Sequence, residues 1–86
     1  MAGPLYMVGG RVAMLDYEKM GLNIKLRRIE CGITQYRLAM ILGVSQAHLC
    51  NVENGRLSLS LKLLVVLRKI LKCTLDDLVV EKNQES

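Results

Sequence analysis

The sequence predicts an all-α domain of five helices, and three observations lead to this fold class. The 86 residues include no Phe and no Trp, so the core must form from Leu, Ile, Val, Met and Ala, which suits packed helices better than a sheet. Apolar residues recur at helical spacing in separate segments. Residues that cap helices precede these segments, and glycines follow several of them. A chain of this length has room for a single domain.

Residues 1–20 are expected to form an N-terminal arm ahead of the domain at residues 21–80. Two apolar runs, Leu5–Val8 and Arg11–Leu15, flank Gly9-Gly10, a pattern typical of a β-hairpin. Because an isolated hairpin is marginally stable in water, it would need a surface to lie on, such as a partner subunit. A disordered leader, or an added stretch upstream of a start at Met14 or Met20, explains the same residues equally well.

The stretch from residue 34 to residue 55 predicts two short helices joined by a tight turn. Thr34 and Ser45 are N-cap residues for helices over 35–42 and 46–54. Gly43 ends the first helix and Gly55 follows the second, since glycine takes a positive φ at little cost. The side chains expected to face inward are Leu38, Ala39, Leu42, Val44, Leu49 and Val52. Those expected to face outward are Gln46, Ala47, His48, Cys50 and Asn51.

The other three helices follow from the same signals. One helix is expected from Asp16 or Leu22 to Cys31 and another from the N-cap Ser60 to Leu71. A short helix from Thr74 to Val80 would have Thr74 and Asp77 as a pair resembling a capping box, before a flexible tail at 81–86. The predicted core face of the fourth helix is Leu61, Leu64, Leu67 and Leu71. Its second apolar stripe, a candidate dimer interface or additional core, is Leu63, Val66 and Ile70.

Basic residues concentrate in the middle of the chain. Residues 25–72 contain nine Lys and Arg against two Glu, within a formal net charge of +4. This distribution fits a domain that binds a polyanion, although ordinary solvated helix faces would look similar. The sequence has no Ser/His/Asp or Cys/His set and no Gly-rich phosphate loop, so we expect neither an enzyme nor a cofactor, and no small-molecule substrate. The few aromatic residues, all Tyr, disfavour RNA binding.

The three cysteines, Cys31, Cys50 and Cys73, are too widely spaced for a metal site or a disulfide framework. They predict reduced thiols in a cytoplasmic protein, with Cys31 and Cys73 as small core residues. Charges interrupt every apolar run before it reaches membrane-spanning length, so no membrane association is expected.

The residues TQYRLAMILGVSQAHLCNVENG, at 34–55, resemble the helix-turn-helix of Cro and phage repressors, often called the xenobiotic-response-element family. The Thr-Gln start, the Leu-Ala pair, the Gly-Val-Ser turn and the Glu-Asn-Gly end all match. The resemblance extends from about Leu22 to Leu78 and implies a five-helix lambda-repressor-like DNA-binding domain. Three positions depart from the family pattern: Arg37 stands where Glu is frequent, Arg68 where a small residue is usual, and Lys72 where Gly is common.

The resemblance also implies roles for single residues. The helix over 46–54 would enter the major groove, with Gln46, Ala47 and Asn51 contacting bases. Gln46 is suited to adenine, and Asn51 would repeat that chemistry or reach a phosphate. An ion pair between Arg28 and Glu53 would join the first helix to this helix and fix their geometry. Contacts to DNA phosphates are expected from Gln35, Tyr36, Arg37, His48, Asn54, Arg56 and Lys62.

The function that follows from this resemblance is a sequence-specific transcriptional regulator, a repressor that binds a palindromic double-stranded DNA site as a homodimer. The alternative is a protein-interaction module with a protein partner, such as an antitoxin subunit or an antagonist of a larger regulator. The two alternatives differ in whether Gln46 and Arg56 or the apolar stripe of the fourth helix is essential.

Overall fold

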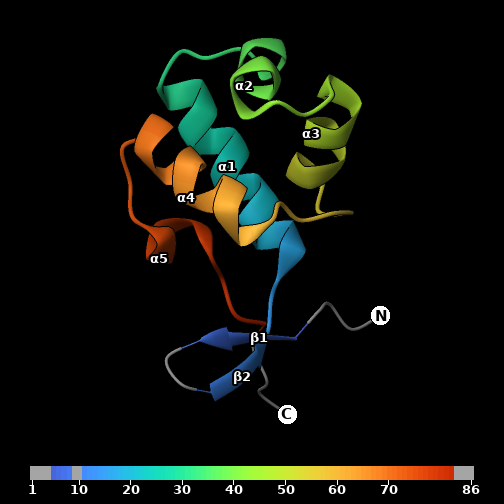
Figure 1. Cartoon of the computed structure of the whole chain (residues 1–86), viewed down its shortest axis with the longest axis vertical. Helices are drawn as coiled ribbons and strands as arrows, with labels where there is room; N and C mark the ends of the chain where they lie inside the picture. Colours follow the sequence, from blue (N-terminus) through green and yellow to red (C-terminus); the bar gives the residue numbers. More distant parts are fainter. Residues whose placement is uncertain (1–4, 9–10, 83–86) are drawn as a thin grey trace.

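The computed structural model of the chain describes residues 5–8 and 11–82 (Figure 1). Within these residues a two-stranded hairpin precedes a cluster of helices. The strands are β1 (Leu5–Val8) and β2 (Arg11–Met14). The helices are α1 (Tyr17–Glu30), α2 (Gln35–Leu42), α3 (Gln46–Glu53), α4 (Leu61–Ile70) and α5 (Leu75–Leu78). The prediction of an all-α domain with five helices is therefore confirmed.

The two strands of the arm pair antiparallel, with Leu5 opposite Met14 and Val8 opposite Arg11. This is the hairpin alternative for the arm; the Gly9-Gly10 link lies outside the described residues. Figure 1 shows the hairpin at the opposite end of the molecule from α2. The expected boundary at residue 20 falls inside α1, because the Asp16 carboxylate accepts a hydrogen bond from Lys19 N at 3.1 Å and starts the helix there.

The end of the described chain returns to this junction. Asp16 N donates to Val80 O at 2.8 Å, Lys82 N donates to Met14 O at 2.7 Å, and Leu15 forms an isolated bridge with Glu81. Of the flexible tail predicted at 81–86, Glu81 and Lys82 pair with the start of the domain, and residues 83–86 lie outside the described residues. Backbone groups on both segments thereby gain partners that neither segment has alone.

Side-chain caps set the starts of the remaining helices, as the sequence predicts. Each cap hydroxyl accepts a hydrogen bond from the backbone N–H three residues later, which satisfies one of the N–H groups that lack a partner within the helix. The four caps are Thr34, Ser45, Ser60 and Thr74.

The core of the helical domain is almost entirely aliphatic. Its buried side chains form one cluster with members from all five helices: Leu15, Met20, Ile24, Leu38, Ala39, Leu42, Leu49, Val52, Leu59, Leu64, Leu67, Leu71 and Leu78. Every predicted inward residue of α2 and α3 belongs to it or packs against it. Leu61 does not, since its exposed fraction is 58%. Leu59, just before the Ser60 cap, is buried instead with Leu64, the arrangement of a hydrophobic staple.

The second apolar stripe of α4 lies at the edge of this core. Leu63 and Ile70 are partly buried and pack against the cluster, whereas Val66 is 39% exposed. Leu63 and Ile70 are therefore only partly accessible to solvent, and Val66 is the most accessible side chain of the three.

The cysteines differ from each other. Cys31 was predicted to be a core residue, but it is exposed because it is the C-cap of α1, beyond the last turn that faces the core. Cys73 packs against the core, and burial raises the pKa of its thiol. Among residues 5–8 and 11–82, no helix has the length and apolarity needed to span a bilayer.

Helix α1 approaches α3 closely at Gly21, which is buried. A Cβ atom at Gly21 would lie 2.3 Å from Val52 O and 2.7 Å from Glu53 O. Only a residue without a side chain allows the two backbones this separation.

A capping box begins α5. Thr74 Oγ1 accepts from Asp77 N at 3.2 Å, and an Asp77 carboxylate oxygen accepts from Thr74 N at 2.9 Å. The hydrogen bond that the Asp77 carboxylate accepts from Thr74 N, together with that from the Thr74 side chain and the nearby Arg27 charge, lowers the pKa of Asp77 from 3.8. The box thus favours the ionised carboxylate.

The lowered pKa of Asp77 predicts a sensitivity to acid. Because its pKa is lower in the folded than in the unfolded chain, Asp77 stabilises the fold above about pH 4, and this stabilisation is lost as the pH falls through the lower, folded pKa. The melting temperature of Asp77→Asn should therefore differ from wild type more at pH 6 than at pH 3. Thermal melts followed by circular dichroism measure this, and a difference independent of pH contradicts it.

Candidate nucleic-acid interface

The turn between α2 and α3 fixes the position of α3, the helix predicted to enter the major groove. Gly43 has φ +74°, and the N–H groups of Gly43 and Val44 donate to Met40 O and Ala39 O. These two hydrogen bonds form a Schellman motif, which ends α2 and reverses the chain. Ser45 then caps α3 through His48 N at 3.0 Å.

Helix α3 buries one side and exposes the other. Leu49 and Val52 lie in the core, and Glu53 is also buried. Of the predicted base-contacting residues, Gln46 and Ala47 are exposed and Asn51 is partly exposed. The three side chains are thus accessible on the outer side of the helix.

The structure brings Arg28 and Glu53 together beneath this helix. Arg28 Nε donates to Glu53 Oε2 at 2.7 Å and Arg28 Nη2 donates to Glu53 Oε1 at 3.1 Å, a bidentate pair. Arg28 Nη1 also donates to Ile33 O at 2.9 Å. The side chains are only 10% and 2% exposed, so the pair is an internal link between α1 and α3.

Two glutamines extend this link to the surface. Gln35 Nε2 donates to Glu53 Oε1 at 3.1 Å, and Gln46 Nε2 donates to Gln35 Oε1 at 3.4 Å. A continuous series of hydrogen bonds therefore runs from the buried ion pair to the exposed Gln46. It turns the Gln46 nitrogen toward α2 and leaves the carbonyl oxygen and one N–H of Gln46 for an external partner. Each of these residues was predicted from the sequence, but the hydrogen bonds that connect them were not.

A second polar pair lies at the other end of α3. Arg56 Nη1 donates to Asn51 Oδ1 at 3.2 Å, which joins a predicted phosphate contact to a predicted base contact. Asn54 Nδ2 lies 3.5 Å from Cys50 Sγ, on the last turn of the same helix.

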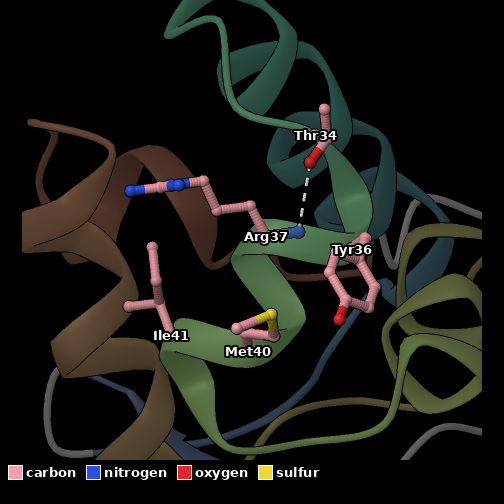
Figure 2. A pocket seen from close by; sticks show the side chains of 5 residues that line it. All are labelled: Thr34, Tyr36, Arg37, Met40 and Ile41. Carbon is pink, nitrogen blue, oxygen red and sulfur yellow. Dashed lines mark hydrogen bonds between the residues drawn. The ribbon is translucent and has the colours of Figure 1, made fainter.

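The other residues predicted to bind phosphates surround this surface unevenly. Tyr36, Arg37, Asn54 and Lys62 are exposed, and His48 is partly exposed. Figure 2 shows Tyr36 and Arg37 on opposite sides of α2, with Tyr36 on the side of α3 and Arg37 pointing away from it. Tyr36 is accordingly the better placed of the two to act together with α3.

The outer face of α2 forms a shallow depression (Figure 2). It is lined by Thr34, Tyr36, Arg37, Met40 and Ile41. Met40 and Ile41 are large apolar side chains on the surface, which the analysis of the sequence did not single out. The signal was available, because inward positions 38, 39 and 42 leave 40 and 41 outside. Within the described part of the chain no three His, Cys, Asp or Glu side chains gather as metal ligands would.

Comparison with known families adds to this geometry. Residues 24–78 match the model of the helix-turn-helix family HTH_3. The chain belongs to this family, the helix-turn-helix of Cro and phage-repressor type. The match includes α2, the turn and α3, and all the residues predicted to contact DNA lie within it.

One relative of known sequence is a phage protein. The chain is 44% identical over 43 residues to the ImmF control region 10 kDa protein of Bacillus phage phi105. The match includes 50% of this chain and 48% of the relative, so it spans about half the length of that protein.

Solved structures show the same architecture. The restriction-modification controller protein C.AhdI of Aeromonas hydrophila superposes with a TM-score of 0.66 at 27% identity, over 73% of this chain and 96% of that one. The P22 c2 repressor, solved in complex with a synthetic operator, gives 0.64 at 32% identity, over 69% and 89%. The fold is therefore that of lambda-repressor-like domains. A match to the enzyme HppE at 23% identity, over 33% of that chain, shows the fold alone.

Proposed function

We propose that this protein is a sequence-specific DNA-binding transcriptional repressor that reads the major groove with α3 as a homodimer on a palindromic site. The observation that carries the proposal is the hydrogen-bonded series from Arg28–Glu53 through Gln35 to Gln46. It holds a donor and an acceptor at the exposed start of α3, before any ligand is present. A preorganised amide loses little conformational freedom on binding.

The readout of bases would divide among three side chains. The free oxygen and N–H of Gln46 match the N6 donor and N7 acceptor of adenine, and the Ala47 methyl can pack on a thymine methyl. Asn51 lies about one turn further along α3. Contacts from the start of α2, from Asn54 and from basic side chains such as Arg56 would set affinity and register through phosphates.

The homodimer supplies the second recognition helix. Two copies of α3 must lie about 34 Å apart to enter successive major grooves on one face of the duplex. The partly exposed stripe of α4, Leu63, Val66 and Ile70, is the surface we assign to the contact between subunits. A palindromic preferred sequence would support this arrangement, whereas a single asymmetric half-site would contradict it.

Titration of the chain against duplex DNA tests the proposal. The preferred sequence is selected from a random duplex pool. We expect log Kd for this sequence to rise linearly with log salt concentration. Arg56→Ala should reduce the slope by about one, whereas Gln46→Ala should cost about 1–3 kcal/mol on the preferred sequence and leave the slope unchanged. Fluorescence anisotropy measures both quantities.

Lys19→Ala is the matched control. Lys19 is exposed on α1 and its replacement removes the same charge as Arg56→Ala, so both the slope and the preference should stay as in wild type. Affinity that is indifferent to sequence in the wild-type protein would contradict the proposal and favour the protein-interaction alternative.

A further inference from the structure

Two hydrogen bonds join Arg56 to Asn51, one through the backbone and one through the side chains. Arg56 N donates to Asn51 O at 2.9 Å while Gly55 N donates to Val52 O at 3.1 Å, and Gly55 has φ +81°. This is the Schellman motif that ends α3, so the backbone itself places Arg56 beside Asn51. The side-chain bond from Arg56 Nη1 to Asn51 Oδ1, at 3.2 Å, then forms between two residues that the motif already holds together.

The chemistry of this pair leaves only one orientation for the Asn51 amide. A guanidinium carries five N–H donors and no acceptor, so the atom of Asn51 that faces Arg56 must be the carbonyl oxygen. The NH₂ group occupies the other corner of the amide. Asn51 and Arg56 together therefore present N–H donors to a partner: the NH₂ of Asn51 and the guanidinium hydrogens not used by Asn51.

From this geometry we infer that Arg56 is a specificity-determining residue, which positions Asn51 as a donor and makes the pair select guanine. The inference rests on the proposed function and refines it. Guanine shows two acceptors, O6 and N7, in the major groove, and thymine shows one acceptor, O4. Adenine places its N6 donor, and cytosine its N4 donor, against the donors of the pair.

Gln46 provides the internal contrast. Its nitrogen donates to Gln35 Oε1, so its own carbonyl oxygen stays free to accept. Both residues carry an amide, and the sequence alone suggested the same adenine-reading chemistry for both. Their internal partners differ, since Gln46 bonds through its nitrogen and Asn51 through its oxygen. The two amides of α3 therefore read different bases.

The inference is tested by selection from a random duplex pool. Fluorescence anisotropy is then measured on four duplexes that differ only at the base pair read by Asn51. Comparing the sequences selected by wild type and by Asn51→Ala identifies the base pair that Asn51 reads, because preference is lost there. At this pair we expect wild type to bind guanine about tenfold more tightly than adenine. Arg56→Ala frees the amide to rotate, and the ratio should fall to within about twofold while preferences at other positions persist.

Two further variants separate positioning from charge. Asn51→Asp keeps a partner for Arg56 but offers acceptors only, so it should lose the preference for guanine and favour cytosine, whose N4 is a donor. Lys62→Ala removes one positive charge from an exposed side chain of α4 and should weaken binding to all four duplexes equally.

The outcomes are distinguishable. A preferred sequence with adenine or cytosine at the Asn51 position, or an Arg56→Ala protein that keeps the guanine preference, overturns this inference and leaves the proposed function standing. A selection that returns no preferred sequence overturns the proposed function, and this inference with it. The Arg56 side chain is exposed, so melting temperatures of Arg56→Ala and wild type should agree and show that the fold is kept.

Discussion

Glu53→Ala is expected to lower the free energy of unfolding by about 3–5 kcal/mol, the cost of leaving a buried charge without its partner. Arg28 would keep its hydrogen bond to Ile33 O but lose both bonds to the carboxylate, in a site that little water reaches. This loss is a large share of the stability of a small domain. Urea titration followed by circular dichroism measures it.

The matched control is the exposed pair of Arg27 and Asp77. Their side chains lie 3.6 Å apart and are 36% and 41% exposed, so Arg27→Ala should cost at most about 1 kcal/mol. Replacing both buried partners, as Arg28→Met with Glu53→Leu, should cost less than Glu53→Ala alone, because no charge is then stranded. If Glu53→Ala unfolds at the same urea concentration as wild type, the ion pair does not hold α1 to α3.

The Glu53→Ala protein should also lose part of its sequence preference. Glu53 Oε1 accepts from Gln35, and Gln35 accepts from Gln46, so removing the carboxylate releases the series that orients Gln46. Under conditions where the variant is folded, its discrimination between bases at the base pair read by Gln46 should fall. This fall should be a larger fraction of the wild-type value than any change in the slope of log Kd against log salt concentration.

Gly21→Ala has the second large expected effect, and its sign is informative. Alanine is about 1 kcal/mol more favourable than glycine inside a helix, so an open position would be stabilised. At Gly21 the new Cβ would meet Val52 O and Glu53 O at 2.3 and 2.7 Å, both backbone atoms that cannot rotate away. We expect a loss of at least about 2 kcal/mol, as α1 and α3 are forced apart.

Gly32→Ala is the control for this substitution. Gly32 has φ +71°, but no atom lies within 4 Å of its added Cβ, so its cost should be limited to about 1–2 kcal/mol of backbone strain. Thermal and urea unfolding of the two variants compare a close contact with a strained backbone. Stabilisation by Gly21→Ala would show that the helices can separate without loss.

Local signals account for what the sequence predicted well. The four predicted hydroxyl caps, the Gly43 turn and the Thr74–Asp77 capping box involve atoms within a few residues of one another. Residues close together in the sequence therefore suffice to predict them. The inward residues of α2 and α3 follow from helical period in the same way.

The errors share a different cause. Leu61 fits the helical period of α4 but lies in its first turn, where Leu59 from the preceding loop already occupies the core. Cys31 lies one residue past α1, and Glu81 and Lys82 gain backbone partners from Met14–Asp16. Each outcome depends on which distant segment arrives at that place, and periodicity within one helix carries no information on this.

By itself the sequence determined five helices, their caps and a helix-turn-helix with polar residues on the outer side of α3. Only the tertiary structure decided that Gly21 is a contact between helices, that Gln35 joins Glu53 to Gln46, and that the Gln46 amide is held through its nitrogen. The physical reason is that hydrogen-bond direction and backbone separation depend on atoms of different elements. Those atoms meet only after the helices have packed.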